Sequence, residues 1–414
     1  MKRIVIIGGG FAGLWSALGA ARKLDELNIS SEVEVLLVNP TADHSIRVRN
    51  YEAHLEETLV PLAQVLDPAG VRWIQGNATD IVPSEKRVTV SVGDSSRSIS
   101  YDKLVLASGS QLAYAPIAGL ADHAFDVDTY AGAKRLQRHL EKVATSGKAG
   151  SLTAVVIGAG LTGIEIAAEL PGRLRSLAQS RGDAPDDNPH VRVILADRTP
   201  EIASAMGGAQ PVIEAALTAL GVTLMPGIAL QAVSADGLTL VDGKRIDAAT
   251  IVWCGGMRAN ALAQCLPVEH DALGRVPVDA CMQVEGIRDV FAAGDVARAR
   301  FTDGHASVMS CQHGRPMGRF AGHNVVCDLL GLPMLPLDID WYTTILDLGP
   351  WGAVYTEGWE RRLAAQGARA KKVKETINRQ RIYPPLTRDR AALFDAAAPT
   401  VQAPPPIGER AGRN

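Results

Sequence analysis

The chain contains two copies of one glycine-rich turn, 150 residues apart, and this repeat limits the fold more than any other feature. The first copy, GGGFAG, runs from Gly8 to Gly13, and the second, GAGLTG, runs from Gly158 to Gly163. Each copy follows a short apolar run, typical of a buried parallel strand, and precedes a helical pattern. The repeat therefore predicts two strand–turn–helix units of the dinucleotide-binding type.

The three glycines of each turn have separate tasks. The first makes the tight turn, the second lets the backbone approach a pyrophosphate, and the third lets the helix pack on the strand. The free N–H groups at the start of the helix then face the phosphates. Similar turns also occur in α/β proteins that bind one nucleotide or none, but two copies favour two bound dinucleotides. We expect a nicotinamide and a flavin, between which electrons pass.

Composition excludes several other classes of protein. The 414 residues are 47% hydrophobic, which suits two or three domains with large cores, and the net charge of −3 gives no general attraction to nucleic acid. The five cysteines form no C-x-x-C pair, which argues against a disulfide framework or a structural metal site and favours a reducing, cytoplasmic compartment. The apolar residues after Met1 lead into the first glycine turn, so we expect neither a signal peptide nor a membrane-spanning helix.

A later apolar strand ends in a carboxylate, Asp295, at the edge where parallel sheets bind ligands. An ordinary strand-end or helix-capping role is the alternative. Together with the first turn and the segment Tyr101–Gly109, it favours a flavin site. With these motifs in this order, residues 1–330 resemble the two-dinucleotide flavoproteins, the pyridine nucleotide-disulphide oxidoreductase superfamily. Segments 158–165 and 251–256 are most similar to type II NADH:quinone oxidoreductases, which are single-chain enzymes.

The resemblance implies an α/β fold with two Rossmann-like dinucleotide-binding domains, for FAD and NAD, plus a C-terminal α+β segment. The expected parts are an FAD-binding domain of residues 1–112 and 280–330, an NAD(P)H-binding domain of residues 113–279, a C-terminal acceptor segment of residues 331–395, and a disordered tail of residues 396–414. The tail is expected to be disordered because it is rich in Ala and Pro. A polar insertion at residues 180–189 is expected to be a surface loop.

The resemblance also implies which residues contact each cofactor. The expected FAD contacts are Gly8, Gly10, Phe11, Ala12, Gly13, Asn39, Ala78, Ser108, Gly109 and Asp295. The expected NAD contacts are Gly158, Gly160, Gly163, Asp197, Gly255 and Gly256.

Two residues at strand ends, one in each unit, are the expected hydrogen-bond partners of the riboses of the two dinucleotides. The first unit usually carries an acidic residue at the end of its second strand, whereas this chain has Asn39, which can still hydrogen-bond a hydroxyl. Asp197 occupies the equivalent place in the second unit, where a carboxylate accepts from the ribose 2′-OH and repels a 2′-phosphate. This favours NADH. Arg198 follows directly and could bind that phosphate, so NADPH stays open.

Two residues are candidates for the chemistry itself. Glu165 lies two residues after the second turn, and the resemblance implies that it helps nicotinamide binding and turnover. A first-turn glutamate favoured by the helix dipole is the alternative. Quinone reductases often show A-Q-x-A-x-Q after the Gly-Asp strand, and here only Gln312 matches. We expect the acceptor to meet the flavin near Gln312 and Cys311, and we treat Glu165 and Gln312 as the candidate catalytic residues.

Quinone is the expected acceptor, and two alternatives remain. Residues 14–60 contain no cysteine, which excludes the close cysteine pair of flavin disulfide reductases. Cys254, Cys281, Cys311 and Cys327 could still pair in space for sulfide or thiol oxidation, although buried, inert cysteines are the simpler interpretation. The second alternative is a flavoprotein whose redox state regulates a binding partner, similar to the apoptosis-inducing factor group.

The C-terminal part suggests a surface for docking. Residues 329–337 are apolar but too short and too rich in Pro to span a membrane, and residues 361–381 carry eight basic side chains. Residues 329–381 could therefore make peripheral contact with the inner face of the cell membrane, or they could simply form a solvated surface. A homodimer is a further expected assembly.

Overall fold

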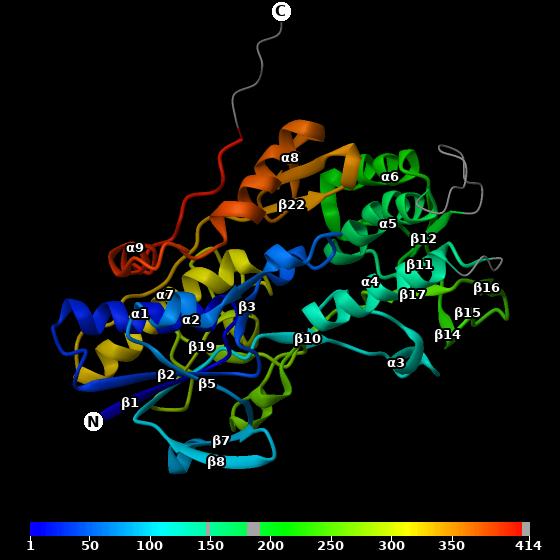
Figure 1. The fold of residues 1–414 in the computed structure, drawn as a ribbon. Coiled ribbons are helices and arrows are strands. Elements are labelled where there is room, and N and C mark those ends of the chain that lie inside the picture. The colour runs from blue at the N-terminus through cyan, green and yellow to red at the C-terminus, as the bar shows by residue number, and fades with distance from the viewer. Residues whose placement is uncertain (146–149, 180–190, 408–414) are drawn as a thin grey trace, which may run out of the picture.

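The computed structural model in Figure 1 describes residues 1–145, 150–179 and 191–407. Two units, each built on a parallel sheet, lie side by side, and a smaller antiparallel sheet completes the C-terminal part. The predicted fold class is therefore confirmed. The predicted loop at residues 180–189 lies outside the described residues.

The first unit contains a five-stranded parallel sheet. Its strands, in spatial order, are β20 (Val290–Ala292), β9 (Lys103–Leu106), β1 (Lys2–Ile7), β2 (Val33–Asn39) and β5 (Arg72–Gln75). The central strands are buried, as their continuous apolar runs predict. Helices α1 (Phe11–Glu26) and α7 (Cys311–Leu330) pack closely together above the sheet in Figure 1.

An antiparallel sheet extends the same core below the parallel sheet in Figure 1. It consists of β6 (Asn77–Val82), β7 (Arg87–Val92) and β8 (Ser95–Ser100). Shorter elements of this unit are β3 (Asp43–Ser45), β4 (Leu59–Pro61), α2 (Leu62–Leu66), β19 (Val276–Val278) and β21 (Ala297–Ala299).

The second unit repeats the pattern around a four-stranded parallel sheet. Its strands, in spatial order, are β13 (Val222–Met225), β12 (Arg192–Ala196), β11 (Thr153–Ile157) and β17 (Thr250–Trp253). Its helices are α3 (Leu120–His123), α4 (Tyr130–Ala144), α5 (Leu161–Gln179) and α6 (Gln210–Ala219). An antiparallel sheet is formed by β14 (Leu230–Ser234), β15 (Gly237–Leu240) and β16 (Arg245–Asp247).

Two crossing strands join the units. β10 (Ser110–Leu112) leaves the first unit and pairs antiparallel with β18 (Met257–Ala259), which returns to it. The chain re-enters the first core at once, since Leu262 and Leu266 pack in the same hydrophobic cluster as the first sheet. From the sequence, residues 113–279 are expected to form the nicotinamide domain. In the structure, some of these residues pack with the first unit instead.

The C-terminal part forms its own small sheet of β22 (Thr343–Asp347), β23 (Ala353–Glu357) and β24 (Arg362–Gln366), with α8 (Gly367–Thr376) packed against it. Helix α9 (Arg390–Ala396) then returns to α1. Residues 397–407 also pack: Ala397 is fully buried, and the Tyr355 hydroxyl donates to the carbonyl of Pro405 at 3.1 Å. The prediction of disorder from residue 396 is therefore wrong for these residues, because apolar contacts and backbone hydrogen bonds hold them, whereas residues 408–414 lie outside the described residues. Within the described ranges, no helix has the length and apolar character needed to cross a membrane.

Candidate functional site

The two glycine turns have the same local geometry. Gly8 has φ of 105° and Gly158 has φ of 107°, values that favour glycine. A Cβ atom at either position would lie only 2.3 or 2.4 Å from the carbonyl oxygen at the end of the neighbouring strand, that of Ala107 or Cys254. Each first glycine thus brings its turn against the adjacent strand, as the sequence motif predicts.

The second and third glycines of the turns differ in their surroundings. A Cβ on Gly13 or Gly163 would collide with the carbonyl oxygen of the first glycine of the same turn, at 1.8 and 1.7 Å respectively. A Cβ on Gly10 or Gly160 would meet no protein atom within 4 Å. The third glycine is thus needed for helix packing, while the second borders open space at a helix N-terminus. This arrangement fits a pyrophosphate, whose place a larger side chain would fill.

The strand-end residues Asn39 and Asp197 hold the turns in shape. The backbone N–H of Gly9 donates to Asn39 Oδ1 at 2.7 Å, and the N–H of Ala159 donates to Asp197 Oδ2 at 2.5 Å. The other Asp197 oxygen accepts from Thr199. Burial opposes ionisation of Asp197, but the hydrogen bonds from Ala159 and Thr199 lower the pKa of its carboxyl group. Both residues, expected as ribose ligands, therefore also have a structural task inside the protein.

The remaining predicted FAD contacts lie around the carboxyl ends of the first sheet. Gly76 N–H donates to the carbonyl of Asn39, which places Ala78, two residues later on β6, near the end of β2. Ser108 follows β9, and its buried hydroxyl has no hydrogen-bond partner in the protein. Gly109 follows directly. An unpaired buried hydroxyl beside the glycine turn is consistent with a ligand that completes it.

Asp295 contacts polar side chains at the carboxyl edge of the first sheet. Its Oδ2 atom accepts from the Ser110 hydroxyl at 2.6 Å and lies 3.7 Å from Nη1 of Arg47. Arg47 also pairs with Asp128 of the second unit. The preceding glycine, Gly294, packs against Ala12 of the first turn, because a Cβ at Gly294 would lie 2.6 Å from Ala12 Cβ. The structure thus brings Asp295 and the first turn together, as the sequence motifs predict.

In the second unit, the equivalent edge contains Gly255 and Gly256 after β17. Gly255 has no room for a side chain, because a Cβ there would lie 2.0 Å from the Trp253 ring. Gly256 has φ of 110° and its carbonyl accepts from the N–H of Ala113, close to the crossing strands. Both glycines follow Cys254, whose carbonyl oxygen lies against Gly158 of the second turn.

Glu165 is the centre of a buried ionic network that the sequence did not reveal. It is 7% exposed, and its Oε1 accepts from Lys374 Nζ at 2.7 Å and from the backbone N–H of Asp347 at 3.0 Å. Asp347 accepts from the Tyr51 hydroxyl at 3.1 Å and pairs with Lys371 at 2.5 Å. The network joins α5 of the second unit to β22 and α8 of the C-terminal part. Glu165, which the resemblance implies helps nicotinamide binding, thus pairs with Lys374 in this structure.

Burial sets the protonation of this network. It raises the pKa of the Glu165 carboxyl group, although Lys374 partly opposes the shift. For Lys374 burial acts to lower the pKa, but the negative charge of Glu165 outweighs it, so the ammonium group stays charged. Burial also raises the pKa of Tyr51 well above its ordinary value. The site therefore holds one buried, charged lysine beside carboxylates.

Gln312 lies in the first turn of α7, which Ser310 caps by accepting from the N–H of His313. Its amide donates weakly to the carbonyl of Trp341 at 3.5 Å and accepts from the Thr343 hydroxyl at 3.4 Å. Gln312 thus links the start of α7 to the C-terminal segment.

All five cysteines are free. Burial raises the pKa of Cys311 and raises that of Cys254 to about 12, so neither thiol is activated as a thiolate. Several basic side chains of residues 361–381 are engaged within the protein and are therefore less available for docking. Lys371 and Lys374 point into the Glu165 network. Arg379 pairs with Glu57, and Arg381 donates to the carbonyl of Ala403.

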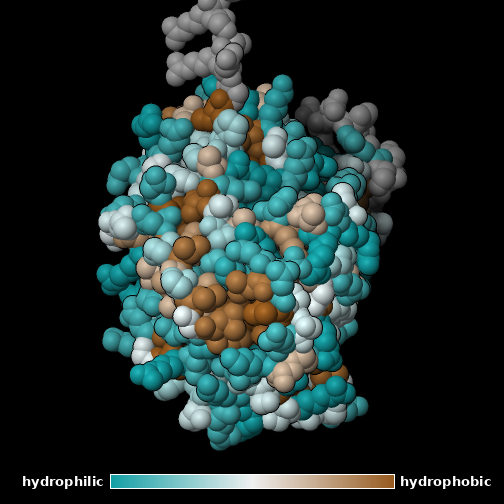
Figure 2. Space-filling model, turned by 90° about the vertical axis from the view of Figure 1, so that its left-hand side faces the viewer, coloured by the Kyte–Doolittle hydropathy of each residue, from teal (hydrophilic) through white to brown (hydrophobic). Residues whose placement is uncertain are grey.

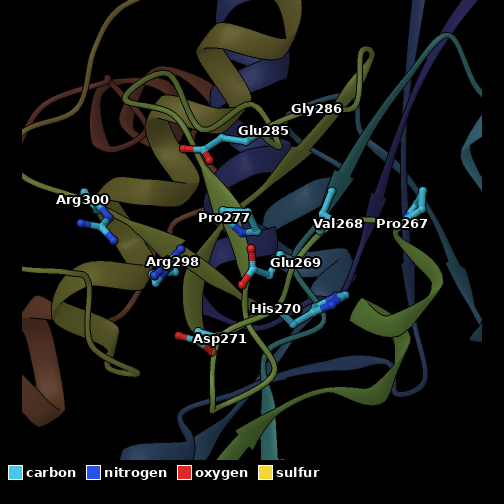
Figure 3. Close-up of a pocket in the computed structure, with 10 residues that line it drawn as sticks. All are labelled: Pro267, Val268, Glu269, His270, Asp271, Pro277, Glu285, Gly286, Arg298 and Arg300. Carbon is cyan, nitrogen blue, oxygen red and sulfur yellow. The ribbon is translucent and has the colours of Figure 1, made fainter.

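A separate cavity of about 620 Å³ lies elsewhere on the first unit (Figure 3). Its walls carry both acidic and basic side chains, including Glu269, Glu285, Arg298 and Arg300. None of the predicted site residues lines it. We therefore place the candidate site at the facing edges of the two sheets and not in this cavity.

Comparison with known proteins agrees with this geometry. Residues 2–318 match the family described as pyridine nucleotide-disulphide oxidoreductase, and the chain belongs to that family. It is an NADH-dependent flavoprotein oxidoreductase.

Two relatives differ in their distance from this chain. An NADH dehydrogenase-like protein of Mycobacterium tuberculosis is 55% identical over 411 residues, covering 98% of this chain and 100% of that protein. A type II NADH:quinone oxidoreductase of Staphylococcus aureus is 27% identical over 311 residues, covering 71% of this chain and 74% of that protein.

Two solved structures share the fold. NDH2 of Plasmodium falciparum, in complex with NADH, has a TM-score of 0.74 at 13% identity and covers 96% of this chain and 97% of its own. The sulfide:quinone oxidoreductase of Aquifex aeolicus has a TM-score of 0.73 at 20% identity and covers 95% of this chain and 92% of its own. At these identities the likeness concerns the fold alone.

Proposed function

We propose that this chain is an FAD-dependent NADH:quinone oxidoreductase. The observation that carries the proposal is the matched geometry of the two glycine turns, each with open space at its second glycine. The relative of M. tuberculosis is named for NADH dehydrogenation, and that of S. aureus for quinone reduction, which supports the choice of donor and acceptor. When bound, FAD would take a hydride from NADH and deliver two electrons to the acceptor.

The residues of the chain would bind and orient the two cofactors. The turn at Gly8–Gly13 and the N-terminus of α1 would hold the FAD pyrophosphate, and Asp295 would accept a hydrogen bond from an FAD hydroxyl. The turn at Gly158–Gly163 would hold the NADH pyrophosphate. Asp197 still has lone pairs for the ribose 2′-OH while it holds Ala159, and its negative charge would repel the 2′-phosphate of NADPH.

The acceptor would meet the flavin between the start of α7 and the C-terminal sheet. Gln312, held by Trp341 and Thr343, could exchange these long hydrogen bonds for one to a quinone carbonyl. Burial raises the pKa of the Cys311 thiol, and the charge of Lys374 partly opposes this shift, so Lys374 lies near the same end of α7. Its positive charge would offset the negative charge that the acceptor gains on reduction.

Peripheral membrane contact would suit a quinone substrate. Figure 2 shows an apolar patch on the face where the C-terminal ends of α1 and α7 lie. Leu332 and Leu335, which follow α7, are 38% and 40% exposed, and Lys2 donates to the carbonyl of Leu329 beside them. We propose that these leucines enter the inner surface of the membrane, while neighbouring basic side chains such as that of Lys2 remain near the lipid headgroups.

Stopped-flow spectroscopy tests the proposed function in two halves. NADH should bleach the flavin absorbance, and subsequent mixing with a soluble quinone should restore it within the turnover time. A flavin that NADH reduces but quinones leave reduced would favour a redox-regulated binding protein, as in the apoptosis-inducing factor group. Reoxidation that depends on the cysteines would favour sulfide or thiol chemistry instead.

A further inference from the structure

Helices α1 and α7 form an unusually close pair. A Cβ on Gly318 would lie 2.3 Å from the carbonyl oxygen of Ala12, and one on Gly322 would lie 2.2 Å from that of Ser16. Because residue numbers increase together along both helices, the helices are parallel, and both begin beside the first glycine turn. Arg315, one turn after the start of α7, therefore lies close to the candidate flavin site.

Two arginines of α7 lie against one tryptophan of α1. The guanidinium carbons of Arg315 and Arg319 lie 5.4 and 4.5 Å from the centre of the Trp15 ring. Arg315 is 7% exposed and Arg319 is 3% exposed. Residues of the C-terminal strap, residues 381–403, reach the same place: Arg319 has one long hydrogen bond, of 3.5 Å, to the carbonyl of Thr400. We call Trp15, Arg315, Arg319 and Arg381 together the arginine groove.

Three buried N–H groups of the arginine groove lack a hydrogen-bond partner. The Nε atoms of Arg315 and Arg319 and the Nε1 atom of Trp15 are buried without a hydrogen bond. Within the described part of the chain, no carboxylate forms an ion pair with Arg315 or Arg319, although 23 such pairs occur in that part. Three buried N–H donors of residues that contact one another around the Trp15 ring thus have no acceptor.

The groove also accumulates positive charge. Burial lowers the pKa of Arg315 to about 10 and that of Arg319 to about 9, and the nearby charge of Arg381 contributes to both shifts. Both values remain above neutral pH, so the guanidinium groups of Arg315 and Arg319 stay charged. Stacking on a single indole ring does not replace the hydration that two buried guanidinium groups lose. Buried charges of this kind are normally paired, so a counter-charge is expected here.

We propose that the arginine groove binds a phosphate group, with Arg315 and Arg319 as charged donors and Trp15 Nε1–H as a neutral donor. Guanidinium groups donate two parallel hydrogen bonds to phosphate oxygens, which suits a tetrahedral oxyanion. The phosphate can come from two sources: the pyrophosphate of FAD, in which case the inference rests on the proposed function, or a separate phosphate-bearing molecule. His44 connects the groove to the first turn, because its Nδ1 contacts the carbonyl of Gly9 at 2.9 Å, and because burial and, to a smaller extent, the charge of Arg315 lower the pKa of its imidazole to about 4.

The test uses the purified full-length protein with four variants. Arg315→Met and Arg319→Met remove one charge each while keeping much of the side-chain volume. Arg362→Met is the matched control, because Arg362 is an exposed arginine paired with Glu357. Arg319→Lys keeps the charge and guards against a variant that fails to fold. The melting temperature is followed against inorganic phosphate, with chloride at equal ionic strength as the reference, and FAD release is followed by fluorescence after dilution.

A separate phosphate ligand predicts that phosphate raises the melting temperature of the wild type and of Arg362→Met, while both groove variants lose this response. The FAD pyrophosphate predicts no phosphate response but a release of FAD roughly tenfold faster or more in both groove variants, the effect of losing one charge-assisted hydrogen bond. Either result supports the site. Unchanged FAD release together with an absent phosphate response, or a response retained by both groove variants, overturns it. A wild-type protein without flavin would refute the proposed function. The melting-temperature response to inorganic phosphate would still test whether the arginine groove binds phosphate.

Discussion

Replacing Lys374 by Met should reveal how the Glu165 network contributes to stability. Lys374 Nζ donates to Glu165 Oε1 at 2.7 Å and to the carbonyl of Ile345 at 3.2 Å, and both side chains of the ion pair are 9% exposed. Methionine keeps the apolar stem, so the loss is mainly electrostatic. Removal of one partner of a buried pair costs about 3–5 kcal/mol, because the other charge is left without compensation.

The expected magnitude can be expressed as a melting temperature. An unfolding entropy of about 2.1 cal/mol/K per residue gives roughly 0.9 kcal/mol/K for the whole chain, so the variant should melt about 3–6 °C lower. Differential scanning calorimetry measures this shift. Lys372→Met, an exposed neighbour on the same helix, serves as the control and should change the melting temperature by less than about 1 °C.

The pH dependence gives a second, independent check. Since burial raises the pKa of Glu165, the folded state binds the proton of this carboxyl group more tightly than the unfolded state does. Protonation of Glu165 therefore contributes to the free energy of unfolding. This contribution is complete at a pH below the pKa of the carboxyl group in the unfolded chain, and it is lost as the pH rises through the pKa in the folded protein. In Lys374→Met the folded pKa should rise further, so the destabilisation should be smaller at acidic than at neutral pH. The double variant Glu165→Gln/Lys374→Met should recover most of the lost stability, because no uncompensated charge remains. A Lys374→Met protein that melts like the wild type at neutral pH would refute this reasoning.

Further predictions concern the cofactors and the acceptor. Gly10→Val should fill the open space of the first turn and yield protein without FAD, while Gly160→Val should keep FAD and lose NADH affinity; absorbance and a binding titration check both. NADH should be preferred over NADPH, and Asp197→Ala should narrow the ratio of kcat/KM values; a wild type that prefers NADPH would show that Arg198 dominates. Replacement of all five cysteines by Ser should leave quinone turnover intact, and its loss with FAD retained would revive thiol chemistry. Gln312→Ala should slow flavin reoxidation but not reduction if it contacts the quinone, and should alter both half-reactions and the flavin spectrum if it contacts the flavin; no change in either would leave it a structural role.

The sequence alone was sufficient for the features that local chemistry determines. Glycine is required where φ is positive and where backbones meet, so the turns at Gly8 and Gly158 could be predicted from their spacing, as could the parallel sheets from their apolar runs. The order of the motifs likewise predicted that Asp295 lies beside the first turn. These signals are short in sequence, and each is determined by its immediate neighbours.

Tertiary structure alone decided which charges meet. Glu165 and Lys374 are 209 residues apart, and no local pattern connects a first-turn glutamate with one lysine among many in a basic stretch. Arg315 and Arg319 belong to an ordinary helical sequence, and only the packing of α1, α7 and the C-terminal strap leaves them buried without carboxylates. The packing of residues 397–407 depends in the same way on distant partners. A buried charge is defined by everything that excludes water from it, and that information exists only once the chain is folded.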